Sequence, residues 1–173
     1  MIATLCYLEK DNKYLMLYRN KKEIDINKGK WIGVGGKMEK GETPEQCLIR
    51  EVWEETGYTL NNYEYRGIVI FNYNEDDPLF MYVYTSSNFS GIEKECNEGD
   101  LKWIPKDEIL DLKLWEGDKI FLKLLFENSP FFYLTLNYEN DNVVSSKLEF
   151  KEKYSCFEVF VPENYVEKIV ENL

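Results

Sequence analysis

The sequence predicts one α/β domain in which a mixed β-sheet is sandwiched between helices. Runs of apolar, β-branched and aromatic residues recur along the chain, and two helix patterns interrupt them. No linker rich in proline, glycine or serine divides the chain, and 173 residues with 44% hydrophobic content can bury a single core. We expect this domain to cover residues 1–150, followed by an extension over residues 151–173 with a strand at Tyr154 to Val161 and a short helix at Pro162 to Asn172.

The strands are predicted from short apolar runs bounded by charged or turn residues. In chain order they cover Ile2 to Leu8, Tyr14 to Tyr18, a short stretch from Trp31, Gly67 to Tyr73, Leu79 to Tyr84, Leu101 to Ile104, Phe131 to Tyr138 and Val143 to Phe150. A charged loop separates the second and third of these strands. Asn140, Asp141 and Asn142 predict a tight turn between the last two, because asparagine and aspartate tolerate the backbone conformation of short hairpins.

The first helix is marked at both ends. Thr43 is a candidate N-cap, Gln46 three residues later completes a capping box, and Pro44 suits the first helical position. Gly57 supplies the C-terminal stop. A second helix is predicted near Asp118 to Phe126, where apolar residues recur at helical spacing.

Three carboxylates share one side of the first helix. Glu51, Glu54 and Glu55 stand at positions i, i+3 and i+4, so their like charges repel unless a cation offsets them. Arg50 lies four residues before Glu54 and can pair with it, which leaves Glu51 and Glu55 as the expected primary ligands of a metal ion. A merely solvated acidic helix is the alternative, but it leaves the repulsion unexplained.

A glycine-rich run precedes this helix. In Gly33-Val34-Gly35-Gly36-Lys37 the glycines let backbone amides and carbonyls approach a ligand closely, and the positive charge of Lys37 suits a phosphate. A hard divalent ion on oxygen ligands, magnesium or else manganese, can bridge the carboxylates to a diphosphate and activate water for attack. The run and the helix together predict a site for phosphate and metal.

These residues resemble the signature of a known family. The spacing is similar to the Nudix box of the Nudix hydrolases, through Gly36, Glu42, Arg50, Glu51, Val52, Glu54, Glu55 and Gly57. The resemblance implies the Nudix fold and hydrolysis of a nucleoside diphosphate linked to another group. It also implies that Glu51, Glu54 and Glu55 bind the metal, that Gly35 contributes a carbonyl, and that Arg50 belongs to the catalytic set. Tyr58 departs from the aliphatic residue that usually follows the box, but it still packs as an apolar body.

A narrower resemblance extends outside the box. The segment from Trp31 to Thr43, together with Leu114 to Asp118, resembles the animal-type oxidised purine nucleoside triphosphatases, which sanitise 8-oxoguanine nucleotides. It implies that Trp115 stacks on the purine, since an indole is a flat platform for a base, and that Asp118 reads the purine edge. The alternatives are a core aromatic for Trp115 and a helix N-cap for Asp118.

The same resemblance implies that Phe71 and Met81 form walls of the pocket that binds the purine base. The alternative is that these two strand residues belong only to the hydrophobic core. Two positions depart from the subgroup. Ile32 replaces an asparagine that hydrogen-bonds the base, and Gly117 stands where a second aspartate can occur.

Two charged residues outside the helix complete the candidate site by similarity. Glu98 resembles an additional metal-binding glutamate supplied by a loop, and Arg19 resembles a basic phosphate contact. An exposed loop carboxylate and a surface arginine are the respective alternatives. A local basic patch, or else a solvated run of loop charges, is expected from Arg19, Lys21, Lys22, Lys28, Lys30 and Lys37.

The composition of the chain limits the kinds of molecule that it is expected to bind. The formal net charge of -11 argues against nucleic-acid polymers and anionic membranes, so we expect a small-molecule nucleotide substrate. The chain has no histidine, which excludes histidine-based catalysis. The four cysteines are widely spaced, Met1 to Leu8 does not read as a signal peptide, and no apolar run reaches membrane length. A cytoplasmic protein with reduced thiols is therefore expected.

The sequence thus predicts metal-dependent hydrolysis of a nucleoside triphosphate to monophosphate and pyrophosphate, with oxidised purine nucleotides such as 8-oxo-dGTP as substrates. A glutamate, with Glu54 as the candidate, takes the proton from water. Nucleotide sugars, dinucleotides and capped RNA are alternative substrates. A nucleotide sensor without turnover is the alternative class, against which the carboxylate set argues. Residues 151–173 carry apolar side chains that need a partner, so a cover within a monomer and a homodimer contact are both open.

Overall fold

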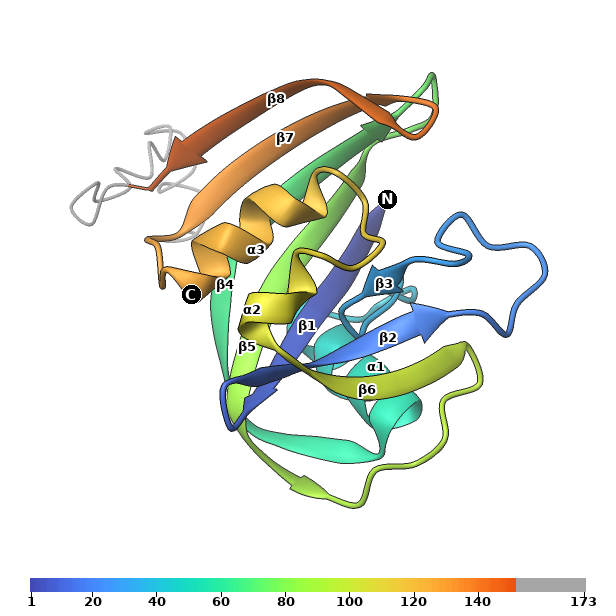
Figure 1. The fold of residues 1–173 in the computed structure, drawn as a ribbon, viewed down its shortest axis with the longest axis vertical. Coiled ribbons are helices and arrows are strands. Elements are labelled where there is room, and N and C mark those ends of the chain that lie inside the picture. Colours follow the sequence, from blue (N-terminus) through green and yellow to red (C-terminus); the bar gives the residue numbers. More distant parts are fainter. Residues whose placement is uncertain (152–173) are drawn as a thin grey trace, which may run out of the picture.

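The computed structural model describes residues 1–151 (Figure 1). In chain order the elements are β1 (Ile2–Lys10), β2 (Lys13–Arg19), β3 (Trp31–Ile32), α1 (Pro44–Thr56), β4 (Tyr58–Tyr73), β5 (Leu79–Gly91), β6 (Gly99–Pro105), α2 (Lys106–Ile109), α3 (Asp118–Phe126), β7 (Phe132–Glu139) and β8 (Asn142–Phe150). The strand and helix expected after Lys151 lie outside the described residues.

The strands form one mixed sheet, as predicted. Their order is β3-β2-β1-β5-β4-β7-β8, with β6 paired to β2 off this path. The β1–β5 and β4–β7 pairs are parallel, whereas the other pairs are antiparallel. The antiparallel β7–β8 hairpin turns at Asn140 and Asp141, which confirms the predicted turn, and Asn140 adopts a positive φ of 55°.

Helices pack on both faces of the sheet (Figure 1). Alternate residues of β1 enter two different cores, because successive side chains of a strand point to opposite faces. Cys6 and Leu8 pack with Leu48 and Val52 of α1 in one core. The other core lies beneath α3 and joins Leu5 and Tyr7 of β1 to Phe121, Leu122, Leu125, Leu134 and Leu136.

The structure corrects several predicted boundaries. β4 begins at Tyr58, directly after α1, and β5 continues beyond Tyr84 to Gly91. The pairing of these two strands shifts register at several points between Leu60 and Gly67, so the alternation of apolar and polar residues that predicts a strand is interrupted there. The four-residue helix α2 was not predicted, since it is too short to show a helical period.

The cysteines agree with the prediction as far as they are described. Cys6, Cys47 and Cys96 are free thiols and buried, while Cys156 lies outside the described residues. Among residues 1–151, no helix is both long enough and apolar enough to cross a lipid bilayer.

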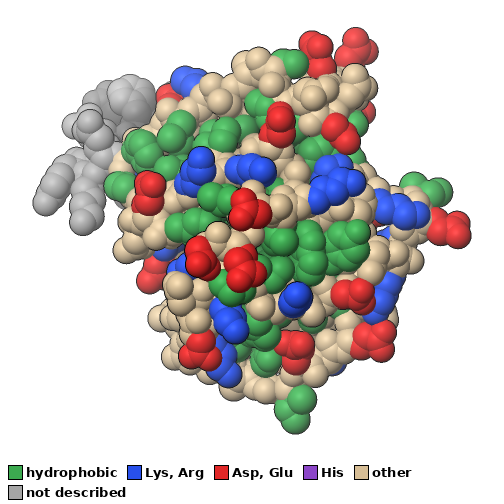
Figure 2. Space-filling model, viewed as in Figure 1, with side chains coloured by type: hydrophobic (Ala, Val, Ile, Leu, Met, Phe, Trp, Pro, Cys, Tyr) green, Lys and Arg blue, Asp and Glu red, His purple; other side chains and the backbone are tan. Residues whose placement is uncertain are grey.

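Charge is distributed without a large basic area on the face that carries α2 and α3. Figure 2 shows acidic and basic side chains interspersed over this face. Several charges of the expected local basic patch are also paired with acids. Lys21 lies 2.8 Å from Glu95, and Lys22 pairs with Glu98.

Candidate active site

Local hydrogen bonds fix both ends of α1 where the sequence predicts them. The Thr43 hydroxyl accepts from the Gln46 amide at 3.2 Å, and the Gln46 side chain accepts from the Thr43 amide at 2.9 Å. Gly57 ends the helix in the left-handed conformation with φ 79°, and its N–H donates to the Trp53 carbonyl. These caps set the rotation of the helix and therefore the direction in which its carboxylates project.

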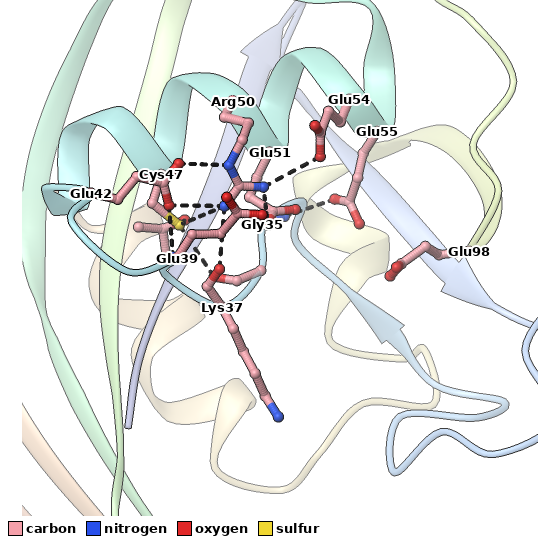
Figure 3. Close-up of polar contacts among 12 residues, drawn as sticks. Gly35, Lys37, Glu39, Glu42, Cys47, Arg50, Glu51, Glu54, Glu55 and Glu98 are labelled. Carbon is pink, nitrogen blue, oxygen red and sulfur yellow. Dashed lines mark hydrogen bonds and ion pairs between the residues drawn. The ribbon is translucent and has the colours of Figure 1, made fainter.

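The glycine-rich loop lies between β1 and the acidic side of α1. It follows β1 through backbone hydrogen bonds from Thr4 N–H to the Gly36 carbonyl at 2.9 Å and from Cys6 N–H to the Val34 carbonyl at 2.7 Å. On its other side, the Gly35 amide donates to Glu55 Oε2 at 2.8 Å (Figure 3). The loop therefore ties the sheet to the helix carboxylates.

Glu55 is a buried acid whose charge is only partly compensated. Its side chain is 5% exposed, and its Oε1 accepts no hydrogen bond within residues 1–151. The nearest cation is the Arg19 guanidinium, with Nη1 3.9 Å from Oε1. Burial raises the pKa of Glu55 to about 7, although the Gly35 hydrogen bond acts in the opposite direction. An oxygen atom in this state is suited to a cation.

Glu51 lies against Gly36 and pairs with Arg50. A Cβ atom on Gly36 would lie 2.5 Å from the Glu51 carboxyl carbon, so only glycine leaves room for the carboxylate there. Arg50 Nη1 lies 2.7 Å from Glu51 Oε1 and 3.3 Å from Glu54 Oε2. The expectation that Arg50 pairs with Glu54 is confirmed. The inference that Glu51 is thereby left unpaired is wrong, because one guanidinium reaches both acids.

Arg50 also binds Glu42, the acid of the preceding loop. Its Nε lies 2.6 Å from Glu42 Oε1, and its Nη2 donates to Glu42 Oε2 at 3.0 Å (Figure 3). These hydrogen bonds lower the pKa of Glu42 to about 2. Arg50 therefore binds the loop acid and the helix acids at once and fixes their positions relative to one another. By contrast, Glu54 is half-exposed and Lys37 points away from the acids (Figure 3).

Arg19 and Glu98 meet on the other side of Glu55. Arg19 is only 7% exposed, so the surface-arginine interpretation is wrong. Its guanidinium lies 2.7 Å from Asp25 and pairs closely with Glu98, which also pairs with Lys22. Glu98 is thus brought beside Glu55 by a shared arginine contact, rather than extending as a free loop charge.

The oxygen atoms present fit a divalent metal ion, although arginines hold them in this structure. Within residues 1–151, no three acidic or cysteine side chains are already converged to bind a metal. The buried Glu55 Oε1 without a hydrogen bond and the Glu51 carboxylate in its glycine cradle are hard donors of the type that magnesium and manganese prefer. A metal ion would take over the charge compensation that Arg19 and Arg50 now provide.

A second cluster surrounds Trp115, which is 5% exposed and part of the core beneath α3. Edge-to-face contacts surround its indole, with centroid distances of 5.4 to 6.2 Å, from Phe71, Tyr73 and Tyr138. Met81 packs partly buried against the same core, as does Phe71. The core-aromatic interpretation of Trp115 is therefore supported, and a stacking role would use a ring that is already fixed by packing.

Lys30 covers the ring of Trp115, a contact that was not predicted from the sequence. Its Nζ lies 3.9 Å from the ring centroid and 3.5 Å from Asp141. The indole N–H donates to Asn27 at 2.9 Å. A base that stacks on this face of Trp115 must displace the Lys30 ammonium.

Asp118 is buried beside this cluster and does not cap α3. The N-cap of α3 is Gly117, whose amide donates to the Tyr138 hydroxyl at 2.8 Å, and no side chain caps the helix. The N-cap interpretation is wrong because the helix begins at Asp118 itself, one residue earlier than capping by Asp118 requires. Burial raises the pKa of Asp118 to about 7, partly offset by the Lys30 charge. Near neutral pH this carboxyl group can both donate and accept hydrogen bonds.

Tyr7 adds a buried polar group that was not predicted. Its hydroxyl is fully buried and makes no hydrogen bond within residues 1–151. Burial, followed by the charge of Asp118, raises the pKa of Tyr7 well above its usual value. The sequence offered one weak signal, because Tyr7 lies two residues after the apolar Leu5 and therefore on the same face of the strand.

Replacing Asp118 by asparagine should change how stability depends on pH. Between about pH 4 and pH 7 the unfolded chain releases the Asp118 proton while the folded chain retains it, so the free energy of unfolding falls as pH rises. Asp118→Asn removes this loss. The free energy of unfolding of the variant, relative to that of the parent, should therefore increase by up to about 4 kcal/mol between these pH values and stay constant above them. Urea unfolding at successive pH values measures the difference, and a constant difference would contradict the buried acid.

Comparisons with known proteins agree with this geometry. A family model described as NUDIX domain matches residues 1–125. The uncharacterized Nudix hydrolase YvcI of Bacillus subtilis is 29% identical over 141 residues, which cover 79% of this chain and 85% of that protein. The oxidized purine nucleoside triphosphate hydrolase of Danio rerio is 29% identical over 129 residues, covering 74% of this chain and 83% of that protein.

A solved structure extends the agreement to the fold. The MutT protein from Bacillus halodurans superposes with a TM-score of 0.77 and 30% identity, covering 86% of this chain and 97% of that one. The Nudix fold is thereby confirmed, and members of this family generally need divalent metal ions. The chain belongs to the Nudix family and is a Nudix pyrophosphohydrolase.

Proposed function

We propose that this enzyme hydrolyses an oxidised purine nucleoside triphosphate, such as 8-oxo-dGTP, to the monophosphate and pyrophosphate. The observation that carries the reaction is the buried Glu55, with one carboxylate oxygen bound by Gly35 and the other without a hydrogen bond. The similarity to the Danio rerio enzyme, named for oxidized purine nucleoside triphosphates, supports this substrate class. The buried free thiols support a reducing compartment such as the cytoplasm.

In this proposal, Glu51, Glu55 and Glu98 hold a magnesium ion, or else manganese, together with the Gly35 carbonyl. Such an ion supplies positive charge for the phosphate oxygens and lowers the pKa of bound water. Arg50 positions Glu51 through its 2.7 Å contact. Glu54 is half-exposed beside the same arginine, where it can bind the metal or accept the proton of the attacking water. Arg19, released from Glu98 and Glu55, can turn to a phosphate, with Lys37 as a further basic contact.

Base recognition is assigned to the cluster around Trp115. The purine would replace the Lys30 ammonium on the indole face, between walls formed by Phe71 and Met81. Asp118 would bind the purine edge. Its raised pKa lets it donate to a carbonyl or ring nitrogen when protonated and accept from N–H groups when ionised. A tryptophan held by three aromatic neighbours costs little entropy to position.

A second candidate is hydrolysis of another nucleoside diphosphate derivative, such as a nucleotide sugar, a dinucleotide or capped RNA. The apolar Ile32, which stands where the oxidised-purine enzymes place an asparagine, favours this candidate. A sensor without turnover is disfavoured, because simple binding does not need a buried acid of raised pKa beside two further carboxylates.

The test is a substrate panel with and without magnesium. The purified protein is given 8-oxo-dGTP, dGTP, ADP-ribose and a dinucleoside polyphosphate, and the products are separated by chromatography. We expect magnesium-dependent release of pyrophosphate, with the highest kcat/KM for 8-oxo-dGTP. Asp118→Ala should reduce the ratio of kcat/KM for 8-oxo-dGTP to kcat/KM for dGTP, because the lost polar contact contributes to discrimination between the two bases. A higher kcat/KM for ADP-ribose or the dinucleotide would contradict the proposed substrate.

A further inference from the structure

One face of the sheet carries an apolar surface that belongs to neither core. We call it the aromatic face and define it by Tyr65, Ile68, Ile70, Phe80, Phe131 and Tyr133. Ile68 pairs with Tyr82 on β5 and with Tyr133 on β7, and Ile70 pairs with Phe80, so these side chains share one side. None of the six belongs to the two core clusters or to the side chains packed against them.

Ring contacts join the aromatic residues of this face to one another and to the neighbouring β5 tyrosines. Tyr65 lies 4.9 Å from Phe131 and 5.5 Å from Tyr82 between ring centroids, and Phe131 lies 5.3 Å from Tyr133. Tyr65 and Phe80 are each 38% exposed. Contiguous apolar surface of this kind usually marks a contact with another segment or molecule.

The chain leaves the described structure at the end of this face. β8 pairs with β7 up to Phe150 opposite Phe132, and the Lys151 amide then donates to the Phe131 carbonyl at 2.8 Å. The described chain therefore ends at Lys151 beside the backbone of Phe131, a residue of the aromatic face.

The remaining sequence has the length and pattern to cover the aromatic face. Apolar residues recur at helical spacing at Tyr165, Val166, Ile169, Val170 and Leu173. A helix over residues 162–173 would be about 18 Å long, and the face measures about 17 Å along β4 from Tyr65 to Ile70. The ten residues 152–161 would then be available as the connection.

We propose that residues 152–173 pack on the aromatic face of their own chain. A tethered segment has an effective concentration in the millimolar range, whereas a second copy must pay the translational and rotational cost of association. The segment therefore occupies the face before another molecule can. The aromatic face lies on the same side of the sheet as α1 and adjoins the α1 core at Tyr84, whose ring centroid is 4.9 Å from that of Tyr65. None of its six residues belongs to the proposed substrate site. The contact therefore concerns stability and oligomeric state, and its test measures neither metal binding nor turnover.

The test measures how fast a cysteine on the aromatic face is alkylated in the full chain. In a Cys156→Ser background the native thiols Cys6, Cys47 and Cys96 are buried, so a cysteine introduced by Phe80→Cys is the accessible probe. Ile169→Asp places a charge on the apolar side of the segment and should speed alkylation at position 80 at least about tenfold. Asn164→Asp adds the same charge on the opposite side of the helical pattern and should leave the rate unchanged.

Leu148→Cys is the matched control probe. Leu148 is 39% exposed, close to the value for Phe80, but it pairs with Leu134 and therefore lies on the α3 side of the sheet. Its alkylation should not respond to Ile169→Asp. Circular dichroism melting confirms that each variant is folded. The proposal is overturned if Ile169→Asp leaves the rate at position 80 unchanged, or if protection disappears on dilution together with a dimer detected by light scattering.

Discussion

Glu55→Gln is expected to lower turnover by at least about a hundredfold while making the metal-free protein more stable. Loss of the carboxylate removes a ligand for a metal ion whose charge stabilisation is worth several kcal/mol. In metal-free buffer above pH 7, however, the parent holds a buried carboxylate whose pKa burial has raised to about 7. Glutamine avoids this cost, so the free energy of unfolding should rise by about 1–3 kcal/mol. Turnover and urea unfolding in chelator measure the two effects.

Glu54→Gln is the matched control for this prediction. Its side chain is 50% exposed and 3.3 Å from Arg50, so removing its charge should change stability by less than about 1 kcal/mol. If Glu54 accepts the proton, its variant should lose turnover without gaining stability. Near-parental turnover of Glu55→Gln would remove Glu55 from the metal site, whatever its effect on unfolding.

The parts of the site that the sequence predicts are those fixed by local contacts. Thr43, Gln46 and Gly57 set the ends of α1 through hydrogen bonds that span at most four residues. The types and spacing of these residues are therefore enough to predict where the helix begins and ends. The common side of Glu51 and Glu55 follows from the helical period alone. For the same reason, the two-residue turn after β7 could be predicted from Asn140 and Asp141.

The parts that the sequence does not predict depend on distant contacts. Arg19 meets Glu98 across 79 residues, and Lys30 covers Trp115 from a loop 85 positions earlier in the chain. No periodicity encodes such pairs, because they arise only when β2, β6 and the loop before β3 are assembled. The burial of Asp118 and Tyr7 is of the same kind. Their raised pKa values come from burial in the core beneath α3, and the sequence does not indicate that an aspartate lies in this core.

The two adjacent glycines of the loop should respond very differently to alanine. Gly35 has φ 147°, and a Cβ there would lie 2.1 Å from the Thr4 carbonyl oxygen, which is backbone of β1. Gly35→Ala must therefore push the loop away from the sheet, and we expect a loss of about 3 kcal/mol or more in the free energy of unfolding. At Gly36 the added Cβ meets only the end of the flexible Glu51 side chain, 2.5 Å away.

Gly36→Ala should consequently melt within a few degrees of the parent, since Glu51 can turn aside. The displaced carboxylate then leaves its place between Arg50 and the loop, so magnesium or manganese affinity and turnover should fall by about 10- to 100-fold. Melting, isothermal titration with manganese, and turnover on the same preparations separate the two glycines. Unchanged metal affinity in a folded Gly36→Ala protein would mean that Glu51 is not a ligand. Glu54, Glu55 and Glu98 would then remain as the acids able to hold the ion, because none of them touches Gly36.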